Sequence, residues 1–401
     1  MEALPGKLRR VDDVSEVDPK PSIIFFIGLA VVVVGSLLTW SALAISLTGS
    51  HAGTHDFISY WASGKQLLEH RNPYDPQTIH SLEVDAGYPR NYPVLMMRNA
   101  PNALFLTLPI GLMPSRVAYV CWLLFLIGCL VASVELLVDG DSYTRFLGYS
   151  FVPCLLCLVM GQTGIFPLLG LAMFLRFNEQ RPYLAGSFLA LCLIKPHLAA
   201  PLMVAIVAWA IYRRRYPVLY AMILAVVVCS VVPIYFDHAV WSDYARMIRS
   251  NGIENEFIPA LGSALRSALK LKAVWPQLIP TALASIWSLC HFIRHREHWS
   301  WEQRIPLLVL VSLAVAPYSW LTDQSIAFVA IALMKPKLDS LLLVIMSLSY
   351  IALLSSLHSH INMWLSMAWL GWYLARQIYQ RQAMNVHEPP AKGAAIAIEN
   401  V

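Results

Sequence analysis

Asp56 is an acidic residue at the start of a short apolar and aromatic stretch, where a carboxylate could take a proton from a hydroxyl group. Phe57, Tyr60 and Trp61 follow at positions i, i+3 and i+4, and this spacing predicts a short helix with one apolar face. Tyr and Trp rings favour the membrane interface, so we predict that the helix lies on a membrane surface. The helix dipole favours an ionised carboxylate in the first turn, with Thr54 as N-cap. Asp56 is therefore either a base held at a lipid surface or a residue that merely completes the cap.

Lys195 is a second residue whose type points to chemistry, because it lies inside an apolar run. An unpaired ammonium group is costly in hydrocarbon, so such residues face a cavity or a charged partner. Pro196 follows directly, and proline breaks a helix and frees backbone groups. The segments on either side are each shorter than a full span, as in broken helices that line a cavity. Two interpretations stay open for Lys195, a substrate-binding cation and a structural ion pair.

Further polar residues interrupt the apolar runs at positions that we expect to share one side of the membrane. Gln162 lies between Gly161 and Gly164, and Asp323 follows a third break in the apolar pattern. A lone glutamine can also simply form a hydrogen bond to a neighbouring helix. We predict that the polar side chains converge at the outer leaflet. The residues expected there are His55, Arg98, Gln162, Lys195, His197 and Asp323.

The composition is that of a protein with many membrane segments. Hydrophobic residues make up 58% of the 401 residues, charged residues make up only 13%, and the mean hydropathy is +0.58. These values lie outside the range of soluble globular proteins. The net charge of +5 is modest, and the basic residues lie in short segments between apolar runs, which indicates membrane topology rather than nucleic-acid binding. The sequence has no Walker loop, GxGxxG or HExxH motif, so we expect neither a metal ion nor a cofactor.

Basic residues set the predicted orientation of the chain. Residues 1–21 are polar and basic, and we predict that they form a cytoplasmic tail. The apolar run over 23–47 is long enough to span a bilayer core of about 30 Å and too long for a signal peptide. Residues 50–98 then form a large first outer loop. Within it, Asp75-Pro76 predicts an N-cap and a second short helix over 76–85.

The remaining pattern predicts an all-α, polytopic transmembrane bundle of about ten to twelve membrane segments. Residues 117–137 are a clear span, and basic clusters and polar breaks alternate after it, which the positive-inside rule places on opposite sides. The number of crossings between Pro101 and Gln162 conflicts with the predicted sides of the flanking segments. The conflict is resolved if one short segment, either 101–113 or 149–160, enters the membrane and returns on the same side. We predict one transmembrane domain over 22–381 and a cytoplasmic tail over 382–401.

Four motifs, in this order, resemble those of the family-87 glycosyltransferases, which are membrane enzymes of the GT-C class. This family includes polyprenol-phosphate-mannose-dependent α-mannosyltransferases. The resemblance covers residues 50–330, and the sequence departs from the family pattern at Tyr92-Pro93, at 94–98 and at Thr322-Asp323. The motifs are Asp56-Phe57-x-x-Tyr60-Trp61-Ala62-x-Gly64-x-x-Leu67-Leu68 with Asn72-Pro73-Tyr74-Asp75-Pro76, Pro153 followed by Gly161-Gln162, Arg181-Pro182-x-x-Ala185-Gly186 leading to Lys195-Pro196, and Pro317-Tyr318-Ser319-Trp320.

The resemblance implies a GT-C-like bundle, with amphipathic helices in the first outer loop and a catalytic domain over 22–381. It also implies inverting transfer of a sugar, with mannose expected, from a polyprenyl-phosphate donor to a lipid or glycan acceptor. The reaction is expected at the outer face of a bacterial plasma membrane, and the catalytic acidic residue of the family maps onto Asp56 as general base. The residues expected to bind the donor phosphate or the substrate are His55, Tyr60, Arg98, Gln162, Lys195, His197 and Asp323.

A protein of a different class fits the same membrane spans. A non-enzymatic transporter of lipid-linked glycans, or a lipid-binding membrane scaffold, would equally explain broken helices and a cationic cavity. Neither gives a reason for a carboxylate at the start of an interfacial helix in a large outer loop. We therefore favour the transferase.

The predicted topology is tested by the sidedness of single cysteines placed in a background that lacks the native ones. Cysteines at Ser81 and His358 should react with an impermeant thiol reagent from outside intact cells. A cysteine at Arg214 should react only after permeabilisation, because the positive-inside rule places the basic triplet in the cytoplasm. Labelling of Ser81 and Arg214 from the same side would contradict the predicted topology.

Overall fold

The computed structural model describes residues 22–48, 56–250, 260–270, 273–355 and 360–387, and in these ranges every regular element is helical. This confirms the all-α class. The helices are, in chain order, α1 (Ile23–Thr48), α2 (Phe57–Leu68), α3 (Pro76–Asp85), η1 (Pro101–Leu106), α4 (Leu108–Gly111), α5 (Ser115–Val138), α6 (Ser142–Tyr149), α7 (Val152–Met160), α8 (Ile165–Phe177), α9 (Pro182–Leu189), η2 (Ala190–Ile194), α10 (Pro196–Tyr212), α11 (Tyr216–Phe236), α12 (Val240–Ser250), α13 (Leu261–Ala268), η4 (Trp275–Leu278), α14 (Ile279–His295), η5 (Arg296–His298), α15 (Trp301–Ala314), η6 (Leu321–Ala327), α16 (Phe328–Met334), α17 (Ser340–Ser355) and α18 (His360–His387).

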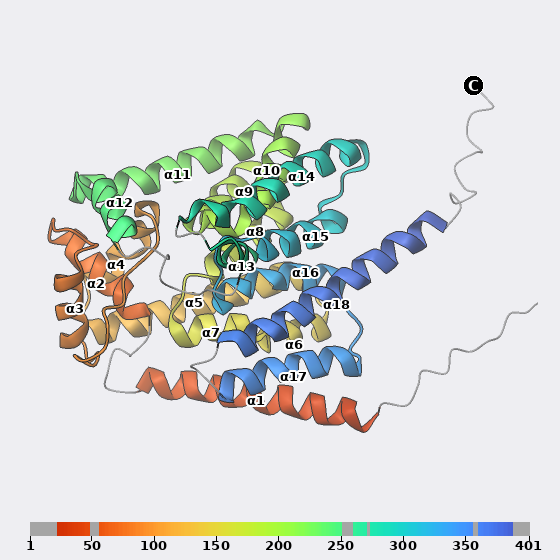
Figure 1. Ribbon diagram of the computed structural model, residues 1–401, viewed down its shortest axis with the longest axis horizontal. Helices are drawn as coiled ribbons and strands as arrows, with labels where there is room; N and C mark the ends of the chain where they lie inside the picture. Colours follow the sequence, from red (N-terminus) through yellow and green to blue (C-terminus); the bar gives the residue numbers. More distant parts are fainter. Residues whose placement is uncertain (1–21, 49–55, 251–259, 271–272, 356–359, 388–401) are drawn as a thin grey trace, which may run out of the picture.

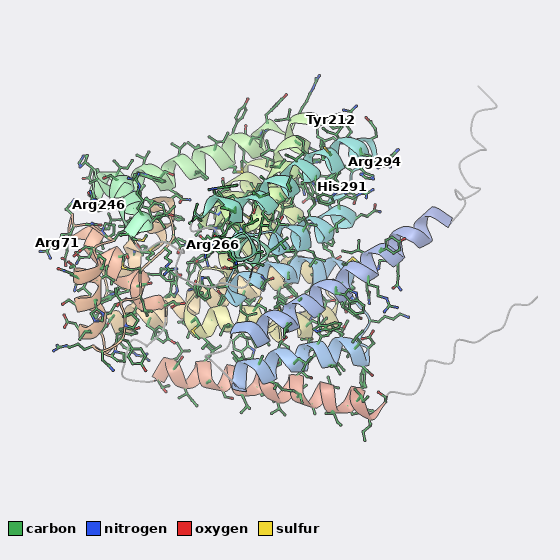
Figure 2. All side chains as sticks on the ribbon, in the orientation of Figure 1. Arg71, Tyr212, Arg246, Arg266, His291 and Arg294 are labelled. Carbon is green, nitrogen blue, oxygen red and sulfur yellow. The ribbon has the colours of Figure 1, made fainter. Side chains whose placement is uncertain are left out.

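The long helices form a bundle, and the short helices of the first loop lie together at one end of it. In Figure 1, α11 runs along one edge of the bundle and α1 along the opposite edge, while α2, α3 and α4 gather at one end beside α12. Figure 2 places Arg71, which follows α2, and Tyr212, the last residue of α10, at opposite ends of the molecule. The arrangement agrees with the predicted opposite placement of the first loop and the Arg213-Arg214-Arg215 triplet, although His358 lies outside the described residues.

Three of the described helices are long and apolar enough to cross a membrane, namely α1, α5 and α11. The first and second confirm the spans predicted over 23–47 and 117–137. Large apolar side chains such as Ile27 and Leu224 are more than half exposed on α1 and α11, as expected for lipid-facing surfaces. α6 and α7, bent by 43° at their junction, qualify together as a fourth span or a re-entrant loop. The larger number of about ten to twelve segments stays a prediction.

The two short segments that are candidates for a re-entrant turn have different structures. Residues 101–113 form only the six-residue η1 and the four-residue α4, which together are too short to cross a bilayer. α4 packs against α2 in the group of helices at the end of the bundle. Residues 149–160 belong instead to the bent α6–α7 pair, which is either a broken span or a re-entrant loop. The helices of 101–113 are therefore too short to cross, and the choice between the two segments for the re-entrant turn stays open.

The prediction that the helix after Asp56 lies on a membrane surface is wrong. Ten of the twelve residues of α2 are buried inside the protein, including the polar Ser59 and Gln66 that should have formed a solvated face. The reason is a close approach to α4, where a Cβ on Gly64 would lie 2.2 Å from the carbonyl oxygen of Thr107. α2 is thus buried among the short helices at one end of the bundle, although the prediction of a helix from its apolar spacing is confirmed.

The second predicted helix of the first loop is confirmed with its cap. α3 begins at Pro76, and the Asp75 side chain accepts a hydrogen bond of 3.1 Å from the backbone N–H of Thr78. This is the arrangement of a capping aspartate followed by proline at the first helical position. The sequence signal was sufficient here because every group that it needs lies within four residues.

We predict that Gly64→Ala destabilises the protein by about 1–3 kcal/mol, although alanine is the better helix former, because its methyl group would overlap the Thr107 carbonyl. Gly128→Ala in α5 is the matched control, since no atom lies within 4 Å of the added Cβ. Thermal unfolding in detergent should show a lower midpoint for the first variant and an unchanged or higher midpoint for the second. Equal midpoints for the two variants would show that α2 and α4 are not in backbone contact.

Candidate functional site

Gln162 is the centre of a polar network that joins four of the predicted residues. Its side-chain N–H donates to the Asp56 carboxylate, and its carbonyl oxygen accepts from the Tyr60 hydroxyl at 2.8 Å. The same oxygen lies 3.4 Å from Nζ of Lys195, which in turn lies 2.7 Å from Oδ1 of Asp323. The structure therefore brings together Asp56, Tyr60, Gln162, Lys195 and Asp323, as predicted for the residues at the three breaks.

A turn at Gly161 places the Gln162 side chain beside the start of α2. Gly161 ends α7 with φ +68°, a left-handed conformation that side chains disfavour, and a Cβ there would lie 2.6 Å from Cβ of Phe57. The Gly161 carbonyl accepts a hydrogen bond of 2.7 Å from the Trp122 indole N–H. Glycine is therefore needed both for the backbone angle and for the close approach of α7 to α2.

The helix break at Lys195 leaves backbone carbonyls that other residues satisfy. η2 ends at Ile194 and α10 begins at Pro196, which confirms the predicted break. Asn102 donates to the Leu193 carbonyl at 2.9 Å, and Asn99 donates to the Ile194 carbonyl at 3.4 Å. These amides from η1 and the residues before it hold the break open, so the Lys195 backbone leaves the helical path.

Lys195 and Asp323 form a buried ion pair. Asp323 is fully buried and Lys195 is 8% exposed. The second oxygen of Asp323 accepts a hydrogen bond of 2.8 Å from the Trp320 backbone N–H at the start of η6. Both carboxylate oxygens are thus occupied within the protein. The structure thus places Lys195 in an ion pair, with Gln162 as a further contact of the ammonium group.

Asp56 does not cap α2. It stands at the N-cap position with helical backbone angles, and its side chain makes no capping hydrogen bond. The carboxylate is only partly buried and is instead oriented by Gln162. Burial raises the pKa of the neighbouring Tyr60 hydroxyl and the Asp56 charge raises it further, so this hydroxyl stays protonated and donates. His55, predicted to line the same site, lies outside the described residues.

Tyr318 stacks on one of the remaining predicted residues, His197, and is subject to the charge of the other, Arg98. The His197 ring stacks on the Tyr318 ring with 3.9 Å between centroids, and Nε2 of His197 is buried without a hydrogen-bond partner among the described residues. Burial raises the pKa of the Tyr318 hydroxyl, and the positive charge of Arg98 partly offsets this effect. Tyr318 therefore contacts His197, and it lies five positions before Asp323 in the chain.

Glu83 is a buried carboxyl group beside this site that the sequence interpretation missed. It is fully buried on α3, and both carboxylate oxygens lie 3.2 Å from the backbone N–H of Leu95. Burial raises its pKa to about 7, against the opposing effects of Leu95 and His80, and the charge of Asp56 adds to the increase. The signal was available, because Glu83 follows the buried Ile79 by four residues and so lies on the apolar face of α3.

The geometry suits proton transfer at a partly exposed carboxylate. Asp56 is partly exposed, whereas Asp323 is fully buried and is neutralised by Lys195. A neutral amide donor holds Asp56 in place without removing its ability to accept a proton. Among the described residues, no three His, Cys, Asp or Glu side chains gather closely enough to hold a metal ion.

Comparison with known proteins gives one family. The model of glycosyltransferase family 87 matches residues 99–343, which is more than half of the chain. The matched range includes Gln162, Lys195, His197 and Asp323, whereas Asp56 and α2 precede it. Neither a curated relative nor a solved structure matches the chain.

We predict that Lys195→Met destabilises the protein by about 3–5 kcal/mol, because it leaves the Asp323 charge buried without its partner. The double variant with Asp323→Asn should regain much of this loss, since the amide oxygen still accepts from the Trp320 N–H. Arg145→Met, which breaks the exposed pair with Glu135, is the control and should cost less than about 1 kcal/mol. Thermal unfolding is measured for these three variants and for the single Asp323→Asn variant, and additive effects of the two site substitutions would contradict direct coupling.

Proposed function

Because the chain belongs to glycosyltransferase family 87, we propose that it moves a sugar from a polyprenyl-phosphate donor to a lipid or glycan acceptor at the outer membrane face. The family makes it a glycosyltransferase, and three apolar helices long enough to span make it a membrane protein. The observation that carries the proposal is the partly exposed Asp56 carboxylate, held by Gln162 where the outer helices meet the bundle. Mannose is the sugar that the resemblance favours.

The proposed reaction is a single displacement with Asp56 as general base. The acceptor hydroxyl gives its proton to an Asp56 oxygen while its own oxygen forms a bond to the anomeric carbon. The bond from that carbon to the phosphate oxygen breaks, and polyprenyl phosphate leaves with the electron pair. Phosphate is a good leaving group, so one base suffices and no general acid is required. Attack from the opposite face inverts the anomeric centre, so a β-linked donor gives an α-glycoside.

The charge developing on the leaving phosphate needs a cation, and we assign this role to Arg98. Lys195 is the other candidate cation. Arg98 acts electrostatically on Tyr318, whose ring stacks on His197. The planar fork of an arginine matches the geometry of phosphate oxygens, whereas a lysine presents a point charge. Arg98 and His197 would therefore bind the donor phosphate, while Gln162 and Tyr60 position the base.

We predict that Asp56→Asn lowers turnover by about 10²–10⁴-fold, because an amide cannot accept the proton although it can still accept the Gln162 hydrogen bond. The assay incubates purified protein with labelled polyprenyl-phosphate sugars and native lipid extract and identifies the product by mass. Asp75→Asn, which alters a cap in the same loop, is the control and should retain activity. A folded Asp56→Asn enzyme with more than half of wild-type activity would exclude Asp56 as the base.

A further inference from the structure

α12 has three distinct faces, two of which are exposed. At about 100° per residue, Trp241, Ala245 and Ile248 fall within an arc of about 60° on the helix surface. Trp241 is 41% exposed and Ile248 is 37% exposed, so this apolar stripe is not covered by the described protein. The neighbouring arc is polar and carries Arg246 and Arg249, both exposed. A third arc, made of Val240, Asp243, Tyr244 and Met247, packs against the rest of the molecule.

The position of α12 along the chain fixes its height relative to the membrane. α11 is a candidate span of 21 residues, about 31 Å long, which matches the thickness of the bilayer core. It ends at Phe236, next to Tyr235, whose side chain is 75% exposed. Exposed aromatic rings at the end of a span belong to the interface belt. α12 begins four residues later and lies beside the end of α11, so it starts at the level of the lipid head groups.

We propose that α12 is an interfacial helix whose Trp241–Ala245–Ile248 stripe lies at the boundary between head groups and acyl chains. Arg249 then faces the lipid phosphates and water, and the exposed Arg246 lies beside it while forming an ion pair of 2.8 Å with Asp243. This is the arrangement of helices that lie in the membrane plane. A polar environment would leave a tryptophan and an isoleucine exposed on one stripe, whereas lipid covers them and accepts the adjacent guanidinium groups. The occupant of this face is the lipid surface itself.

The packed face of α12 connects the lipid surface to the polar network. Tyr244 lies 5.4 Å from Tyr74, measured between ring centroids, and the Tyr74 hydroxyl donates to the Asn99 carbonyl at 3.0 Å. Asn99 is also the residue that donates to the carbonyl before Lys195. α12 therefore holds the first loop against the bundle at a defined depth in the membrane. This inference requires the membrane span α11 and does not depend on the reaction proposed above.

The test measures the depth of spin labels on α12 in nanodiscs of phosphatidylcholine and phosphatidylglycerol. The thiols of Cys121, Cys229 and Cys290 are at least partly accessible and are replaced first, while the four buried cysteines remain. Nitroxide labels are then placed singly at 241, 245, 248 and 242. Collision with oxygen reports lipid, and collision with a water-soluble nickel chelate reports solvent. A label at Arg71, whose side chain is 65% exposed at the end of the molecule, is the aqueous control.

Labels at 241, 245 and 248 should collide mainly with oxygen, and labels at 242 and 71 mainly with the nickel chelate. If one of the three labels on the apolar stripe disturbs packing, the other two are enough to test the proposal. Nickel accessibility at 241 and 248 equal to that at 71 would overturn the proposal. Oxygen accessibility at 242 equal to that at 248 would also overturn it, because α12 would then be immersed without an ordered polar face.

Discussion

The Gln162 side chain links two charged groups that have different surroundings, and its amide can do so in only one orientation. Its N–H group meets the carboxylate of Asp56, and its oxygen meets the Tyr60 hydroxyl and the Lys195 ammonium group. A reversed amide would place its oxygen against a carboxylate and its N–H group against two donors. Hydrogen bonds to charged groups contribute about 1.5–3 kcal/mol each, so this orientation is strongly preferred. The position of Asp56 therefore depends on the ion pair deeper in the bundle.

Buried charge requires the irregular backbone seen around the network. Lys195 and Asp323 lie among apolar helices, where each charge alone would be expensive, and their geometry has to satisfy both carboxylate oxygens. The break at Pro196 brings the ammonium group to that position, and the left-handed turn at Gly161 brings the amide. Asn99 and Asn102 then satisfy the carbonyls that the break exposes. The polar network and the broken helices thus depend on one another.

The breaks were predictable from the sequence because proline, glycine and buried charge act locally. Pro196 beside Lys195 and Gly161 beside Gln162 each mark a place where a helix is readily interrupted. The burial of α2 was not predictable in the same way, because a spacing of 3.6 identifies an apolar face but does not show what covers the opposite one. That information lies in the contact of Gly64 with Thr107, more than forty residues away along the chain. Lys195 and Asp323 are still further apart along the chain. The sequence therefore could not show whether Lys195 forms an ion pair or lines an open cavity.

We propose that α12, and not α2, contacts the membrane surface. This arrangement suits the proposed transfer from a lipid-linked donor. A base on a membrane-surface helix would move with the lipids, whereas α2 is buried and Asp56, directly before it, is held by a side chain from the bundle. Pre-organised groups lower a reaction barrier more than mobile ones, because no reorganisation is needed at the moment of reaction. Contact with the lipid surface is then left to α12, which meets the first loop through Tyr244 and Tyr74. In the proposed mechanism, the depth of the site in the membrane and the orientation of the base are therefore set by two different helices, so that lipid motion at one need not disturb the other.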